Sequence, residues 1–173
     1  MKHIICAMLH NHPGVLLRLT GLFNRRGFNI VSLTASETRN PEFSRMTVVI
    51  EGDEDVLEQV KYQMAKVVDV KKVSYFSAEE VSCSELLVVK VQALPENREE
   101  VLRIAGSYHA RVLNIGESSM TLEATGYGGE LDLFIEKLKK PGILEMARTG
   151  ITALEKGDHC LLDAEREADL FGE

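Results

Sequence analysis

The feature that most constrains the fold of this chain is an order of elements that occurs twice. In the first half, apolar strand-like runs alternate with two segments whose apolar residues follow helical spacing. Strands are expected at 3–10, 28–37, 44–51 and 68–76, with helices up to about Arg26 and over 54–66. The order βαββαβ is the ferredoxin-like split motif. It predicts an antiparallel sheet with both helices on one face.

The second half shows the same order with little sequence identity. Strands are expected at 85–93, 110–115, 118–125 and 143–155, the last broken at Gly150, with helices opened by Pro95 and over 130–139. The chain is therefore predicted to be α+β, with two tandem ferredoxin-like domains at 1–77 and 84–157, a linker around 77–84 and an acidic tail at 158–173. A sheet with helices on one face leaves its other face and an edge to cover, which favours dimerisation through sheets.

The loop between the first strand and the first helix is the most informative local feature. Asn11 or His12 can cap the helix, Pro13 suits its first turn, and Gly27 can end it. Free N–H groups at a helix N-terminus suit a carboxylate or phosphate, and Gly14 lets a ligand approach closely. The same residues also fit a capped helix with an ordinary turn, so the local sequence alone leaves both interpretations open.

Composition and charge exclude several classes of protein. Of the 173 residues, 27 are acidic and 20 are Lys or Arg, and the formal net charge of −7 argues against nucleic-acid binding. No apolar run is long enough to span a bilayer, and no signal peptide is recognisable, so we expect a cytoplasmic protein. The three cysteines, at 6, 83 and 160, fit neither a disulfide framework nor a CxxC site. Cys6 is expected to be a core residue.

Nothing in the sequence indicates catalysis. His10 and His12 have no third ligand nearby for a metal, and no cysteine is placed as a nucleophile. The glycine-rich segment 126–129 lacks the spacing and the lysine of a phosphate-binding loop, so we interpret it as a turn. An acylphosphatase-like enzyme would need an arginine in the first loop, whereas the first arginine of this chain is Arg18, inside the helix.

Several segments resemble a known family. His-Pro-Gly-Val-Leu at 12–16, Gly-Leu-Phe-x-x-Arg-Gly-Phe-Asn-Ile at 21–30 and Ser-Arg-Met-Thr at 44–47 resemble the ACT domain, an amino-acid-sensing module. More specifically, they resemble the regulatory (small) subunit of acetolactate synthase, also called acetohydroxyacid synthase. Leu-Val-Val-Lys-Val at 87–91 and Ala-Arg-Thr-Gly-Ile at 147–151 are similar to the C-terminal domain of that family. The resemblance covers about residues 2–157.

The resemblance implies a homodimer whose ACT domains pair side by side and bind a branched-chain amino acid, typically valine, at their interface. One subunit would contribute Asn11, Gly14, Val15 and Leu16, and the other Asn29 and Ile30. The N–H groups would then hold the carboxylate and the apolar side chains would hold the isopropyl group.

The resemblance also implies a partner. The catalytic large subunit of the family carries thiamine diphosphate, Mg²⁺ and usually FAD, and this chain is expected to hold no cofactor or metal and to be no enzyme itself. It would activate the catalytic subunit and confer feedback inhibition by valine on branched-chain amino-acid synthesis. The alternative is an ACT-type sensor of another amino acid that acts on a different enzyme.

Overall fold

The computed structural model describes residues 1–161 of the chain. Their contacts divide into two compact units, one of Met1–Cys83 with the segment from Ile151 on, and one of Ser84–Gly150. The last residues of the expected second domain 84–157, which are 151–157, therefore belong to the first unit. Most of the acidic tail, from residue 162, lies outside the described residues.

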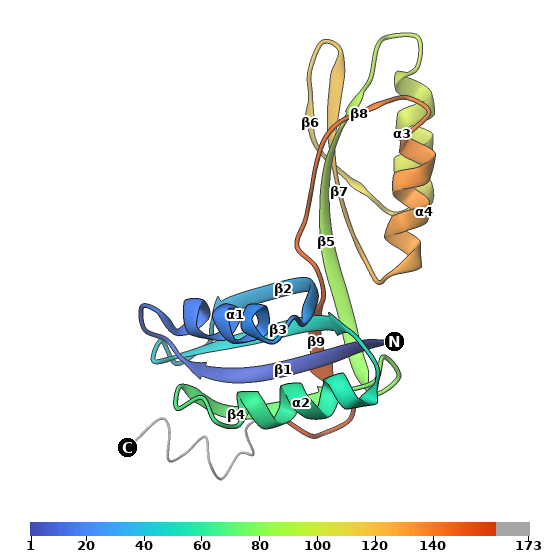
Figure 1. Ribbon diagram of the computed structural model, residues 1–173. Helices are drawn as coiled ribbons and strands as arrows, with labels where there is room; N and C mark the ends of the chain where they lie inside the picture. The colour runs from blue at the N-terminus through green and yellow to red at the C-terminus, as the bar shows by residue number, and fades with distance from the viewer. Residues whose placement is uncertain (162–173) are drawn as a thin grey trace. The chain divides into compact units, whose positions relative to one another are not determined.

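The first unit has the expected order of elements around an antiparallel sheet. The elements are β1 (Lys2–His10), α1 (Val15–Arg25), β2 (Asn29–Glu37), β3 (Phe43–Glu51), α2 (Glu54–Met64) and β4 (Val70–Phe76). The strand order is β2-β3-β1-β4, so β2 and β4 are the edge strands of this sheet. Helices α1 and α2 lie side by side on one face of this sheet (Figure 1). The predicted α+β class is confirmed.

Alternation along the strands separates two apolar layers in this unit. The helix-facing layer joins alternate strand residues to the inner faces of both helices. It contains Ile5, Ala7, Leu9, Met46, Val48, Ile50, Val15, Leu19, Phe23, Leu57, Val60 and Met64. The start of α2 and the end of α1 are formed by capping residues, whereas the second unit's first helix begins at Arg98 and not at Pro95 as predicted. Asp53 accepts a hydrogen bond from the N–H of Val56 at 3.0 Å, and Gly27 follows α1 with φ +69°.

The other face of this sheet is covered by the chain itself. Ile4, Cys6 and Met8 of β1 pack with Val81 and with residues from the segment after Gly150. Strand β9 (Thr152–Glu155) belongs to this layer through Ala153, which is fully buried. Its carbonyl accepts a hydrogen bond from the Arg45 guanidinium at 2.9 Å. Pairing with the sheet of a second copy is therefore not needed to cover this face. The edge strands β2 and β4 are still available for such pairing.

The second unit repeats the arrangement. Its elements are β5 (Val81–Gln92), α3 (Arg98–Ser107), β6 (Arg111–Ile115), β7 (Ser119–Gly126), α4 (Gly129–Leu138) and β8 (Ile143–Arg148). The strand order is β6-β7-β5-β8, and α3 and α4 lie together on one face (Figure 1). The predicted break at Gly150 is confirmed, since β8 ends before it and β9 begins after it. The predicted linker 77–84 is wrong in its second half, because Val81 is buried and already part of β5.

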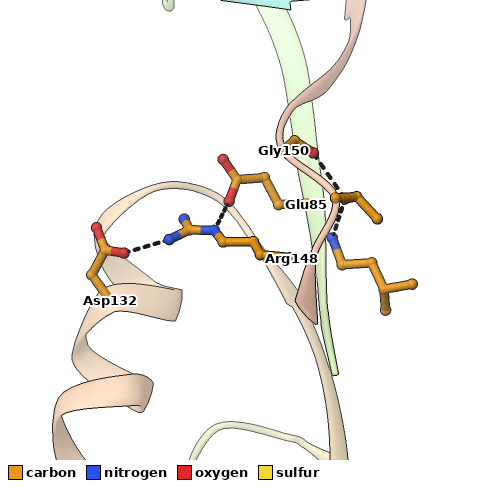
Figure 2. A network of polar contacts seen from close by, with 6 residues as sticks. Glu85, Asp132, Arg148 and Gly150 are labelled. Atoms are coloured by element: carbon orange, nitrogen blue, oxygen red, sulfur yellow. Dashed lines mark hydrogen bonds and ion pairs between the residues drawn. The ribbon is translucent and has the colours of Figure 1, made fainter. Parts of the chain in front are cut away.

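A polar network closes one end of the second unit (Figure 2). The guanidinium of Arg148 binds the buried carboxylate of Glu85 and, at 2.6 Å, the carboxylate of Asp132 on α4. Desolvation lowers the pKa of Arg148, but the bonds to Asp132 and Glu85 together outweigh it and raise this pKa. The hydroxyl of Thr149 donates to the carbonyl of Gly150 and accepts the N–H of Leu86. The network ties β8 to β5 and to the first turn of α4.

Candidate functional site

The loop that joins β1 to α1 does not cap the helix as the sequence predicts. The N-cap is Gly14, with φ +92° and no side-chain cap, so the predicted caps Asn11 and His12 are wrong. Both side chains have other partners. His12 lies against Asp69, at 3.0 Å between Nε2 and Oδ1. The positive φ favours glycine at position 14, since other residues adopt it with strain.

Asn11 is bound to the strands beside it. Its amide nitrogen donates to the carbonyl of Pro41 at 2.8 Å and to the carboxylate of Glu37 at 3.3 Å, and its amide oxygen accepts the Ser44 hydroxyl at 2.8 Å. Its backbone N–H donates to the carbonyl of Glu42 at 2.7 Å. Asn11 therefore fixes the start of the loop against the turn between β2 and β3.

The first turn of α1 offers a receptor for a small anion. The first N–H groups of a helix have no intrahelical partner and lie at the positive end of its dipole. This turn contains no acidic residue that would compete with an anion. A Cβ placed on Gly14 would meet no atom within 4 Å, so the space above the loop is open. Leu16 is 44% exposed beside it, whereas the side chain of Val15 is buried in the core. The side chain of Val15 is therefore not available to a ligand, and its N–H donates to the carbonyl of His12 at 3.4 Å.

Asn29 and Ile30 lie at the opposite end of the same sheet. Asn29 begins edge strand β2 and pairs with Glu51, which pairs with Lys2 at the start of β1. The loop follows the other end of β1, about 26 Å away at about 3.3 Å per residue. Asn29 is exposed and Ile30 is partly buried against the core. One chain thus brings Asn11, Gly14, Val15 and Leu16 together, and keeps the remaining two predicted residues apart from them.

Sequence reasoning missed the buried carboxylate beneath this loop. Asp69, between α2 and β4, is 5% exposed, and its carboxylate binds both His12 and the guanidinium of Arg18. Its backbone carbonyl accepts the N–H of His10 at 2.9 Å. A signal was available, because an acidic residue between Val68 and Val70 next to a strand is unusual, and Arg18 lies one turn beyond Gly14.

Other candidate sites have structural roles or stay untested. Residues 1–161 hold no group of three or more His, Cys, Asp or Glu side chains arranged to bind a metal ion. The segment 126–129 is the turn between β7 and α4, with φ +53° at Gly128. Cys6 is fully buried, as predicted for a core residue. In the part of the chain that the structure describes, each helix is too short or too polar to cross a membrane.

Two family models together match most of the chain. Residues 5–72 match the model described as an AHAS small subunit-like ACT domain. Residues 84–157 match the model described as the small subunit of acetolactate synthase. The first match contains the loop, α1 and β2, and the second contains all helices of the second unit.

Relatives match over nearly their whole length. A probable acetolactate synthase small subunit of Archaeoglobus fulgidus is 42% identical over 158 residues, which are 91% of this chain and 99% of the relative. The small subunit of acetolactate synthase isozyme 3 of Escherichia coli is 38% identical over 159 residues, which are 91% of this chain and 98% of that subunit. The crystal structure of the Thermotoga maritima acetolactate synthase small subunit superposes with a TM-score of 0.85 at 30% identity, covering 92% of this chain and 99% of that one. The chain therefore belongs to the family of acetolactate synthase small subunits, with an N-terminal ACT domain.

Proposed function

We propose that this chain is a non-catalytic regulatory subunit that activates the catalytic subunit of acetolactate synthase and makes it sensitive to valine. The observation that carries the proposal is the full-length match to small subunits of that enzyme together with an open helix N-terminus in the ACT domain. The effector would thereby regulate the synthesis of branched-chain amino acids.

The loop supports binding of an amino-acid carboxylate. The N–H groups at the start of α1 would hold the carboxylate, and the left-handed Gly14 leaves the approach open. Leu16 and Ile30 would pack around the side chain of the effector. Burying an aliphatic side chain contributes roughly 1.5–3 kcal/mol, which favours valine over alanine but discriminates weakly among valine, leucine and isoleucine.

A second copy of the chain would complete the site. Strand β2 is an edge, and its far end, Glu37, contacts Asn11. If two copies pair antiparallel through β2 about a two-fold axis near Leu33, Asn29 of the second copy lies opposite Glu37. This places Asn29 and Ile30 of one copy beside the loop of the other, the arrangement that a single chain cannot provide. Symmetric pairing creates two equal sites.

A site shared by two copies gives a physical route to inhibition. An effector shifts a conformational equilibrium only if it binds one state better than the other, and useful couplings are on the order of 1–3 kcal/mol. Closing the two copies around the effector changes the geometry of the dimer, so valine would favour one dimer arrangement. The catalytic subunit would respond to that arrangement.

The partner would supply the chemistry. We propose that thiamine diphosphate, Mg²⁺ and FAD belong to the catalytic large subunit, and that this chain binds none of them. The relatives' designation as small subunits supports a large partner.

The test is the conversion of pyruvate to acetolactate by the catalytic subunit of the same organism, with and without this chain, over a titration of valine. Activation that valine reverses is the expected result. Activation without valine sensitivity would keep the partner and exclude valine as the effector, and a panel of other amino acids would then identify it. No activation would contradict the proposed partnership.

A further inference from the structure

Asp69 contacts three parts of the loop region at once. Its backbone carbonyl holds the end of β1 through the N–H of His10, at 2.9 Å. Its two carboxylate oxygens have different partners. Oδ1 binds the imidazole of His12, and Oδ2 binds the guanidinium of Arg18. Residues before, within and after the loop are therefore bound to one residue, His10 to its backbone and His12 and Arg18 to its side chain.

The burial of Asp69 gives these contacts their strength. Its side chain is 8% exposed, whereas those of His12 and Arg18 are 48% and 56% exposed. A buried carboxylate is costly unless it is paired, so the two half-exposed groups are held inward over it. The other nitrogen of His12 lies 3.2 Å from the carbonyl of Pro13, which fixes the ring on both sides.

The same contacts determine what the loop can offer a ligand. Both oxygens of Asp69 are occupied, so this carboxylate is not a ligand contact. The guanidinium of Arg18, one turn beyond Gly14, is committed to Asp69, which leaves the backbone N–H groups of α1 as the receptor for an anion. Asn11 holds the opposite side of the loop through the carbonyl of Pro41 and the hydroxyl of Ser44.

We propose that Asp69 is the positioning residue of the effector site, which holds the loop 11–14 and the first turn of α1 in the arrangement that binds the carboxylate of the amino acid. This inference rests on the proposed function. Without the Asp69 contacts the loop samples other arrangements, and the apparent affinity falls by the fraction of time that it spends in the competent one. If that fraction drops to about a tenth, the dissociation constant for valine rises about tenfold.

The experiment compares the full-length chain with Asp69→Asn, which keeps the shape of the side chain and removes its charge. Calorimetry gives the dissociation constant for valine, and the assay with the catalytic subunit gives activation and inhibition separately. We expect the dissociation constant and the inhibitory concentration of valine to rise about tenfold, with activation in the absence of valine unchanged. A general loss of structure would lower activation as well.

A matched control is Asp132→Asn, the same change of a carboxylate to an amide on α4 of the second unit, where the side chain is 64% exposed. This variant should bind valine as the unmodified chain does. Arg18→Gln keeps a side-chain amide that can donate to Asp69, and His12 still binds the other carboxylate oxygen, so this variant should fold even if Asp69→Asn does not. It should also raise the dissociation constant. If Asp69 acts through Arg18, the double variant should be no worse than the single ones.

The outcomes separate the two proposals. If the unmodified chain binds valine and both Asp69→Asn and Arg18→Gln bind it equally well, the positioning role is wrong and the proposed function stands. A parallel loss of activation and binding would also overturn the positioning role of Asp69, whereas additive effects in the double variant would show that Asp69 acts mainly through His12. If the unmodified chain binds no branched-chain amino acid, the proposed effector itself fails and this inference fails with it.

Discussion

Asn11 and Asn29 lie at opposite ends of the sheet of the first unit, separated by nearly the full length of β1. Both were predicted to bind one effector, which a single chain cannot achieve with this separation. Asn11 instead contacts Glu37, the far end of the edge strand that Asn29 begins. Variants of Asn11 and Asn29 can therefore test whether two copies of the chain share one site.

The first prediction is complementation between Asn11→Ala and Asn29→Ala. Each variant alone should lose valine binding while keeping its fold, since both positions are exposed. After subunit exchange in an equal mixture, half of the dimers are mixed and each mixed dimer has one intact site, so about a quarter of the sites should return. Calorimetry measures the fraction of sites. Recovery of no sites after confirmed exchange would contradict a site that is shared between two copies in this way.

The second prediction concerns Gly14→Asp. The new carboxylate would occupy the open space above the loop and repel the carboxylate of valine, so the enzyme should become resistant to inhibition. We expect the inhibitory valine concentration to rise about tenfold or more, which corresponds to roughly 1.4 kcal/mol. Gly14→Ala is the matched control, because it brings the same backbone strain without the charge. Equal resistance in both variants would show that strain, rather than charge, is responsible.

The third prediction concerns the network of Figure 2. Arg148→Met leaves the buried carboxylate of Glu85 without its cation, and we expect a loss of about 3 kcal/mol in the free energy of unfolding of the second unit. Asp132 is 64% exposed, so Asp132→Asn should cost less than about 1 kcal/mol. Urea unfolding followed by circular dichroism measures both. A comparable loss in the two variants would contradict the assignment of Glu85 as the critical partner.

The fourth prediction uses the thiols. Burial raises the pKa of Cys6, with smaller opposing effects from Arg45 and Thr47, so its thiolate is scarce at pH 8. Cys160 is exposed. Iodoacetamide at pH 8 should therefore modify Cys160 quickly and Cys6 only after unfolding, as mass spectrometry of the digested protein would show. Rapid modification of Cys6 in the folded chain would mean that the layer formed by β9 opens in solution.

Local sequence signals predicted most of the elements. The apolar spacing of α1 and α2 and the turn at Gly27 depend on residues within one or two turns of each other, and the structure confirms them. The start of β5 was missed, because polar residues alternate with Val81 and Cys83 and resemble a linker until their packing partners are known.

The sequence by itself determined the repeated order of elements, the α+β class and the family. Tertiary structure alone decided what covers the back of the first sheet, since Ala153 reaches it from far along the chain. It also decided that Asn11 binds strands rather than capping α1, and that Asp69 gathers His12 and Arg18. The physical reason is that helix and strand patterns are encoded in neighbouring residues, whereas a buried charge or an uncovered sheet face is compensated by whichever distant residues the fold brings near.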